Sequence, residues 1–307
     1  MYQVRVLVLC GAHPLYTNWT APRSTFTSLL PRAKDRHWSL LLHQGLPLNN
    51  MAIFAKAPTT CVSFLLPGPV IIQTDEASSE VLYPNYQNCW SLREKTRGRK
   101  KAAILQPGIS KDLEKVKAGV GINSSDEVDF FVLLDNVAAE QVHSLLSCPA
   151  LKRFAQMIEQ RAVDTALYML QEEDREGIQM AVGPFLHLLE GNLLKAADPT
   201  TPSGKTRKLY LYATHDVTLM PILMALGIFD HKWPPFAADL TMELYQHQES
   251  KEWFVQLYYH GEEQVPRGCP DKLCPLDKFL NTMSLYAVSP EKYHMLCSQA
   301  QTMELGE

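Results

Sequence analysis

The stretch that most limits the fold lies at residues 209–227, where a β-prone run leads through two polar residues into an apolar helix. Residues 209–214 read L-Y-L-Y-A-T, which is typical of a strand, and His215 and Asp216 follow directly. The apolar run after them ends at Gly227, the residue type that most often closes a helix. This order predicts an α/β fold with a mostly parallel sheet, in which both polar residues lie at the carboxyl edge.

Two long helices and a hairpin are also predicted. Residues 150–168 and 174–197 carry apolar side chains at every third or fourth position, the spacing of an amphipathic helix. Residues 239–260 hold two β-prone runs around the polar sequence Q-E-S-K, which indicates an antiparallel hairpin. His187 lies among apolar neighbours in the second helix, and we interpret it as structural rather than catalytic.

Composition excludes some classes of protein. The chain has 307 residues, of which 46% are hydrophobic and 20% charged, as in ordinary globular proteins. Its formal net charge of −4 gives no indication of nucleic-acid binding. No uninterrupted apolar run reaches the length of about 18 residues that a membrane-spanning helix needs.

The first 68 residues differ from the rest of the chain. They contain six basic residues and one acidic residue, are rich in proline and show no sustained period of strand or helix. We therefore expect residues 1–68 to form an atypical, poorly ordered N-terminal segment and residues 69–307 to form the folded domain. The alternative interpretation is a transit peptide, because arginine and hydroxyl residues with few acids are typical of mitochondrial presequences.

The seven cysteines are an odd number, so they cannot all pair within the chain. Cys269 and Cys274 lie close together in C-P-D-K-L-C. They are equally compatible with a short disulfide loop and with free thiols.

The neighbouring His215 and Asp216 suggest acid–base chemistry. At the end of a strand, an imidazole can donate a hydrogen bond to an anion, and a carboxylic acid can give a proton to a leaving group. The alternative is that Asp216 caps the helix that follows and that His215 has no special role.

A resemblance to a known family bears on this choice. The segment K-L-Y-L-Y-A-T-H-D-V-T-L, followed by L-G-I-F and W-P-P-F-A-A-D-L-T-M-E-L-Y, resembles the carboxyl-terminal half of the histidine acid phosphatases. The segments V-I-I-Q-T-D-E-A-S-S-E-V-L-Y-P-N-Y, D-F-F-V-L-L-D-N-V-A-A-E-Q and E-Q-V-P-R-G-C-P-D-K-L-C-P-L-D look like a mitochondrial member of that family that acts on a lysophospholipid. The resemblance runs from about Pro69 to the C-terminus.

The resemblance implies a fold and a chemistry. The histidine phosphatase fold has a mostly parallel central sheet flanked by helices and a helical cap, and we expect its N-terminal part to be incomplete here. In such enzymes the residue matching His215 binds the phosphate, and the residue matching Asp216 is the proton donor. The resemblance further implies a small-molecule lysophospholipid phosphomonoester as substrate, no cofactor or metal, a monomer, and a mitochondrial location.

The nucleophilic motif of this family, R-H-G-x-R-x-P, does not occur in the 307 residues. In intact members its histidine attacks phosphorus and forms a phosphohistidine. Arg36-His37 lacks the glycine, and in residues 4–15 Cys10 and His13 stand where the family has histidine and arginine. We interpret the similarity of residues 4–15 to the motif as chance.

The nucleophile therefore stays unassigned, and two interpretations remain. The first is an acid phosphatase that hydrolyses the phosphomonoester of a lysophospholipid. The second is a catalytically inactive product of the same family, from alternative splicing or a truncated gene model.

A basic run occupies residues 93–101 and contains six lysines and arginines. Such runs are most often solvated loops, and this is our prediction. The alternative is docking on an anionic lipid surface.

Overall fold

The computed structural model describes residues 2–10, 51–55, 72–73, 75–142, 148–202 and 206–304 of the chain. The chain divides into two compact units. The first comprises residues 1–85, 182–228 and 234–289, and the second comprises residues 86–181, 229–233 and 290–307.

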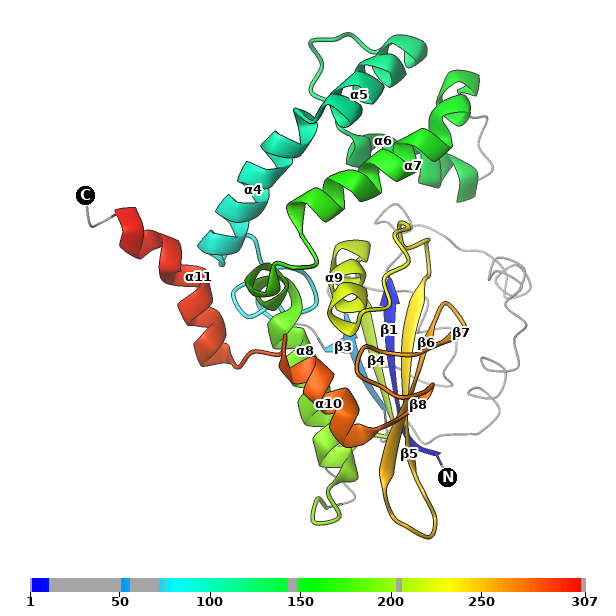
Figure 1. Ribbon diagram of the computed structural model, residues 1–307, viewed down its shortest axis with the longest axis vertical. Coiled ribbons are helices and arrows are strands. Elements are labelled where there is room, and N and C mark those ends of the chain that lie inside the picture. The colour runs from blue at the N-terminus through cyan, green and yellow to red at the C-terminus, as the bar shows by residue number, and fades with distance from the viewer. Residues whose placement is uncertain are drawn as a thin grey trace. The chain divides into compact units, whose positions relative to one another are not determined.

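The first unit is built on a sheet to which eight strands contribute in the described part of the chain (Figure 1). The strands are β1 (Tyr2–Cys10), β2 (Met51–Ala55), β3 (Ile72–Gln73), β4 (Leu209–Thr214), β5 (Asp239–Gln246), β6 (Trp253–Tyr259), β7 (Glu262–Gln264) and β8 (Leu273–Pro275). Their order is β3-β2-β4-β1-β5-β6-β7, and β8 pairs with β6.

The sheet is mixed, which corrects the prediction of a mostly parallel one. Strand β4 pairs in parallel with β1 and β2, and β2 pairs in parallel with β3. The remaining pairings, from β1–β5 to β6–β8, are antiparallel. The reason lies in the connections, because strands joined by short turns, such as β5 and β6, pair antiparallel. The hairpin predicted at residues 239–260 is this pair and is confirmed.

Part of the segment 1–68 belongs to this sheet. Strand β1 lies between β4 and β5, and β2 lies between β3 and β4. The segment that we expected to be separate from the domain beginning at residue 69 thus supplies two strands of its sheet. The other residues of the segment fall outside the described ranges.

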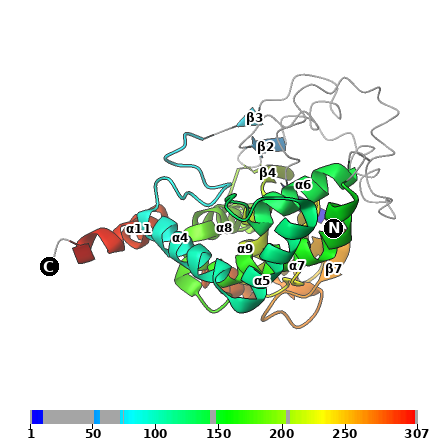
Figure 2. The ribbon, with the colours of Figure 1, turned by 90° about the horizontal axis from the view of Figure 1, so that it is seen from above.

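In the described part of the first unit, three helices accompany the sheet: α8 (Arg175–Ala197), α9 (Asp216–Leu226) and α10 (Leu276–Ser284). In Figure 2 the strands β3, β2 and β4 follow one another, with α8 and α9 on one side of β4. Helix α9 packs against β1, and α10 packs against α9 and β6.

Helix α8 is fixed to β4 through Tyr212. The ring of Phe185 meets that of Tyr212 edge-on at a centroid distance of 5.1 Å. The Asn192 side-chain amide donates a hydrogen bond of 2.7 Å to the Tyr212 hydroxyl. The helix predicted at residues 174–197 is confirmed, and its five repeating apolar side chains are all buried: Ile178, Val182, Phe185, Leu189 and Leu193.

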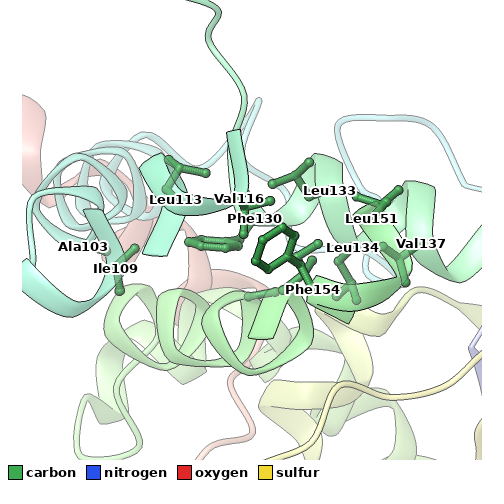
Figure 3. Close-up of a cluster of buried hydrophobic side chains, with 12 residues drawn as sticks. Ala103, Ile109, Leu113, Val116, Phe130, Leu133, Leu134, Val137, Leu151 and Phe154 are labelled. Carbon is green, nitrogen blue, oxygen red and sulfur yellow. The ribbon is translucent and has the colours of Figure 1, made fainter. Parts of the chain in front are cut away.

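The second unit is helical. It contains α4 (Trp90–Ile104), α5 (Pro107–Val120), α6 (Phe130–Val142), α7 (Pro149–Met169), α11 (Pro290–Glu304) and the first residues of α8. Helices α4, α5 and α6 all pack against α7. The helix predicted at residues 150–168 is α7 and is confirmed. Figure 3 shows the core between them, which includes Ile109, Val116, Phe130, Leu133, Leu151, Phe154 and Ile158.

The basic run lies in helix α4 and not in the solvated loop that we predicted. Leu92, Thr96 and Ala103 bury one side of this helix. These positions are spaced four and seven residues apart, as the helical period requires. The period is hard to recognise in the sequence because most residues between them are charged.

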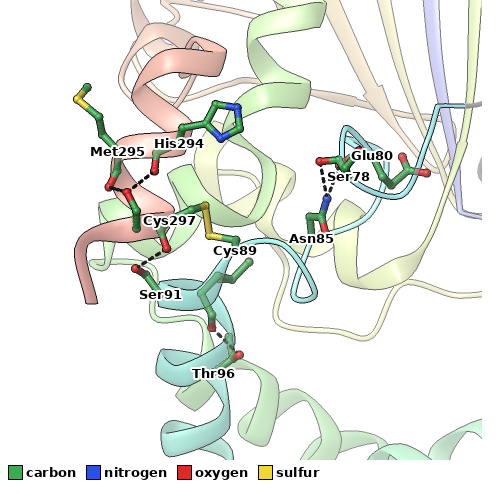
Figure 4. The surroundings of a disulfide bond; sticks show 11 residues. Ser78, Glu80, Asn85, Cys89, Ser91, Thr96, His294, Met295 and Cys297 are labelled. Carbon is green, nitrogen blue, oxygen red and sulfur yellow. Dashed lines mark hydrogen bonds between the residues drawn. A yellow bond between two sulfur atoms is a disulfide. The ribbon is translucent and has the colours of Figure 1, made fainter. Parts of the chain in front are cut away.

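Two disulfides are present among the described cysteines. Cys269 and Cys274 are bonded, which resolves the choice between a disulfide and free thiols. The second disulfide joins Cys89 to Cys297, 208 residues apart, and fastens α11 to the start of α4 (Figure 4). The Ser91 hydroxyl donates a hydrogen bond of 3.1 Å to the Cys297 carbonyl beside it. Cys148 is exposed and not disulfide-bonded.

Two glycines of α8 provide a matched test of the packing in the first unit. A Cβ at Gly183 would lie 2.6 Å from the Val288 Cγ2 and 2.8 Å from the Tyr286 carbonyl oxygen, whereas a Cβ at Gly191 would meet nothing within 4 Å. Gly183→Ala should therefore destabilise the protein by about 1–3 kcal/mol, the usual cost of overpacking. Gly191→Ala should stabilise it by about 0.5–1 kcal/mol, because alanine loses less backbone entropy in a helix.

Thermal unfolding followed by circular dichroism would measure both variants. The midpoint should fall for Gly183→Ala and rise slightly for Gly191→Ala. Equal midpoints in the two variants would contradict the close packing of Gly183 against residues 286–288.

Candidate functional site

The junction between β4 and α9 holds the two residues singled out from the sequence. Strand β4 ends at Thr214, His215 continues in an extended conformation with φ −123° and ψ 164°, and α9 begins at Asp216. The carbonyl oxygen of His215 accepts hydrogen bonds of 3.0 Å from the backbone N–H groups of Thr218 and Leu219. His215 thus occupies the predicted turn alone, and Asp216 is already the first residue of the helix.

The capping alternative for Asp216 is met only in part. The N-cap residue is His215, and its side chain makes no capping hydrogen bond. One carboxylate oxygen of Asp216 accepts a hydrogen bond of 2.7 Å from the backbone N–H of Val217. A negative charge in the first turn also interacts favourably with the helix dipole. Both side chains are half-buried, so the junction is open to solvent.

A segment remote in sequence packs against this junction. The Thr218 hydroxyl, which is fully buried, donates a hydrogen bond of 2.8 Å to the carbonyl oxygen of Leu82. This contact holds the next residue, Tyr83, with its ring edge-on to the imidazole of His215 at a centroid distance of 5.1 Å. Tyr83 was not identified from the sequence, although it lies in the V-L-Y-P-N-Y stretch that carries the family resemblance.

Tyr83 is coupled electrostatically to Asp216. Burial raises the pKa of the Tyr83 phenol above its ordinary value, and the negative charge of Asp216 raises it further. The phenol therefore stays protonated around neutral pH and can act as a hydrogen-bond donor beside the two site residues.

The carboxyl end of β1 lies beside the junction. Cys10, the last residue of β1, is in register with Thr214, the last residue of the parallel strand β4. The chain therefore leaves β1 at the same sheet edge at which His215 and Asp216 leave β4. Residues 11–50, with His13 and His37, fall outside the described ranges, and the nucleophile remains unassigned.

A further carboxyl group lies at this edge and was also missed from the sequence. Asp239, the first residue of β5, pairs with Leu9, whose partner on the other side is Ala213. Burial raises the pKa of Asp239, and the hydroxyl of Thr241, which donates to it at 2.9 Å, acts in the opposite direction. Asp216 thus follows the end of β4 and Asp239 begins β5, and these two strands flank β1.

Three further observations concern metal binding, His187 and membrane-spanning helices. No group of three or more histidines, cysteines or carboxylates in the described ranges could hold a metal ion. His187, which we interpreted as structural because its sequence neighbours are apolar, lies on α8 with its side chain half exposed and Nδ1 3.9 Å from a carboxylate oxygen of Glu190. None of the helices in the described ranges is long and apolar enough to cross a membrane.

Comparison with known proteins places these residues in a family context. The family model described as "Histidine phosphatase superfamily (branch 2)" matches residues 71–260, which include the β4–α9 junction. Lysophosphatidic acid phosphatase type 6 of Mus musculus is 81% identical over 240 residues, covering 78% of this chain and 57% of its own length. The Homo sapiens protein of that name is 77% identical over 239 residues, covering 78% of this chain and 56% of its own length. This chain thus spans little more than half the length of these relatives.

Solved structures resemble the fold. The phytase of Klebsiella sp. ASR1 superposes with a TM-score of 0.57 at 12% identity, covering 94% of this chain and 98% of that protein. The phytase of Hafnia alvei, in complex with myo-inositol hexakis sulphate, superposes with a TM-score of 0.56 at 12% identity, covering 96% and 98%. At this level of identity the similarity shows the fold alone.

The link between Tyr83 and Asp216 can be tested by titration. In Asp216→Asn the negative charge is gone, so the pKa of Tyr83 should fall, yet stay above the ordinary value of about 10 because burial remains. Carbon-13 NMR of ring-labelled tyrosine across alkaline pH would follow the phenol, and Tyr83→Phe would identify its resonance. The same titration curve in the parent and in Asp216→Asn would show that the two groups are not coupled.

Proposed function

Because the chain belongs to the histidine phosphatase superfamily (branch 2), we propose that the β4–α9 junction is the phosphate-binding and proton-donating part of an acid phosphatase site. The substrate we propose is lysophosphatidic acid, which would be hydrolysed to monoacylglycerol and phosphate. The observation that carries the proposal is the position of His215 and Asp216, side by side where β4 ends and α9 begins.

The geometry suits a phosphate ester. The N-terminus of α9 presents backbone N–H groups and the positive end of the helix dipole, which favour an anion. In the proposed complex, the imidazole of His215 donates a hydrogen bond to a phosphoryl oxygen. Asp216 in its protonated form gives its proton to the oxygen that leaves phosphorus, so that the product departs as an alcohol.

The choice of a lysophospholipid rests on the relatives. The Mus musculus and Homo sapiens proteins at 81% and 77% identity are named lysophosphatidic acid phosphatases. At such identity the substrate-contacting residues of the shared region are expected to be largely the same. The phytases, at 12% identity, support only the fold on which the site is built.

The proton-donor role makes a prediction that depends on the leaving group. Asp216→Asn should lower kcat for lysophosphatidic acid about 10²–10⁴-fold, because its alkoxide leaving group needs a proton. The same variant should hydrolyse 2,4-dinitrophenyl phosphate almost as fast as the parent, because that phenolate leaves without one. Phosphate release at acid pH measures both reactions. An equal loss on the two substrates would mean that Asp216 does not act as the proton donor.

A second candidate function is a non-catalytic member of the family that binds a lysophospholipid without hydrolysing it. It is favoured by one observation, the absence of R-H-G-x-R-x-P from the 307 residues. Loss of a nucleophile removes most of the benefit of the groups that act with it. In this case the parent chain and Asp216→Ala would release phosphate at equal rates, at the level of a contaminant.

Activity that disappears in Asp216→Ala would instead support the phosphatase and raise the question of the nucleophile. Cys10, His13 and His37 would then be the first residues to replace, each by alanine. A phosphoenzyme trapped by acid quenching and analysed by mass spectrometry would identify the residue directly.

A further inference from the structure

Helix α4 divides its basic residues between two environments. Lys95 and Arg99 both bind Asp174, with nitrogen–oxygen distances of 2.8 Å and 2.6 Å. Lys100 binds Asp129 at 2.5 Å. These three cations are therefore matched by carboxylates within the second unit, and they help to fix α4 to the helices around it.

The other three basic residues of the run are exposed. Arg93, Arg97 and Lys101 are spaced four residues apart, so they form one row along the helix. Glu94 lies 3.7 Å from the Arg93 guanidinium and compensates one of these charges in part. Among the described residues, no carboxylate lies within salt-bridge distance of Arg97 or Lys101.

Apolar side chains lie at both ends of this row. Trp90 begins the helix and is half-buried, with the guanidinium of Arg93 5.4 Å from its ring centroid. Leu105 is the C-cap residue, and 77% of its surface is exposed. At 3.6 residues per turn, the five positions from Trp90 to Leu105 fall within about a third of the helix circumference. We call this row the α4 face: Trp90, Arg93, Arg97, Lys101 and Leu105.

The composition of the α4 face fits the surface of an anionic bilayer. Arginine and lysine place their charges among phosphate headgroups, while tryptophan and leucine are the side chains that enter the boundary between headgroups and acyl chains. A nucleic acid fits less well, because the chain carries a net charge of −4 and the row is only three cations long. We propose that the α4 face docks the protein on membranes rich in anionic lipids.

No residue of the α4 face belongs to the β4–α9 junction, so membrane docking does not depend on phosphatase activity. Each lysine or arginine near an anionic surface strengthens binding about fivefold, so the three together should contribute about a hundredfold. The binding should weaken as salt is added, because exposed charges are screened over about 10 Å at 0.1 M salt.

The test uses the full chain and sedimentation with lipid vesicles. Phosphatidylcholine vesicles with cardiolipin should bind the protein, and vesicles of phosphatidylcholine alone should not. The triple variant Arg93→Gln, Arg97→Gln, Lys101→Gln should bind the cardiolipin vesicles about a hundredfold more weakly. The matched control removes three exposed lysines of α5 and α7 (Lys111→Gln, Lys115→Gln, Lys152→Gln) and should change binding less than fivefold.

Several outcomes would overturn the proposal. Equal losses of vesicle binding in the two triple variants would indicate attraction by overall charge. Equal binding of the parent to vesicles with and without cardiolipin would also contradict the proposal. Retention of binding by the α4 variant, or binding of the parent to single-stranded RNA but not to vesicles, would do the same. Leu105→Gln provides a second test. At high salt the apolar contribution to vesicle binding remains, so loss of the Leu105 side chain should weaken the residual binding.

Circular dichroism and the thermal midpoint control for folding. The replaced side chains are exposed and none of them binds Asp174 or Asp129, so both triple variants should unfold within a few degrees of the parent. Phosphate release, where the parent shows it, should be unchanged on a soluble aryl phosphate. Phosphate release therefore tests the phosphatase proposal, and vesicle sedimentation tests membrane docking, so that the failure of one can be told from the failure of the other.

Discussion

Parallel backbone pairing on both sides of β4 is the constraint on which the candidate site depends. Strands β1 and β2 flank β4, and Tyr212 binds α8 through its ring and its hydroxyl. The strand therefore cannot shift its register without breaking two ladders and a buried hydrogen bond. Because β4 is fixed in this way, so is the point at which His215 leaves the sheet. The position of the two candidate site residues, His215 and Asp216, thus follows from strand pairings in which neither residue takes part.

The local features were predictable, and the reason is visible in particular residues. Helices α7 and α8 show their period in the sequence because residues such as Ile158 and Phe185 must face a core. The β4–α9 junction was predictable because the strand, the turn and the helix follow one another directly in the sequence. The end of helix α9 was predictable from Gly227, whose φ of 69° suits glycine. Helix α4 was missed because its charges hide a short buried side made of Leu92, Thr96 and Ala103.

The missed parts of the site depend on contacts between segments far apart in the chain. Tyr83 meets His215 only because the carbonyl of Leu82 accepts a hydrogen bond from Thr218, and no local pattern encodes that contact. Asp239 reaches the sheet edge only through the antiparallel pairing of β5 with β1. The mixed character of the sheet has this origin only in part, because β1 and β5 are far apart in sequence, whereas a short turn makes β5 and β6 antiparallel. The sequence patterns therefore located His215 and Asp216 at the end of β4 but not Tyr83 and Asp239, which the fold brings near them.

The disulfide between Cys89 and Cys297 has a consequence for biosynthesis. Its two sulfurs belong to the same helical unit, yet the ribosome makes them 208 residues apart, and the strands β4 to β8 are translated in the interval. Cys89 therefore has no correct partner while these 208 residues are translated, and Cys148 becomes available to it as a wrong partner long before Cys297 does. A cell that makes this protein has to delay oxidation or correct it afterwards. The start of the helical unit is thus translated 208 residues before the cysteine that locks it to α11.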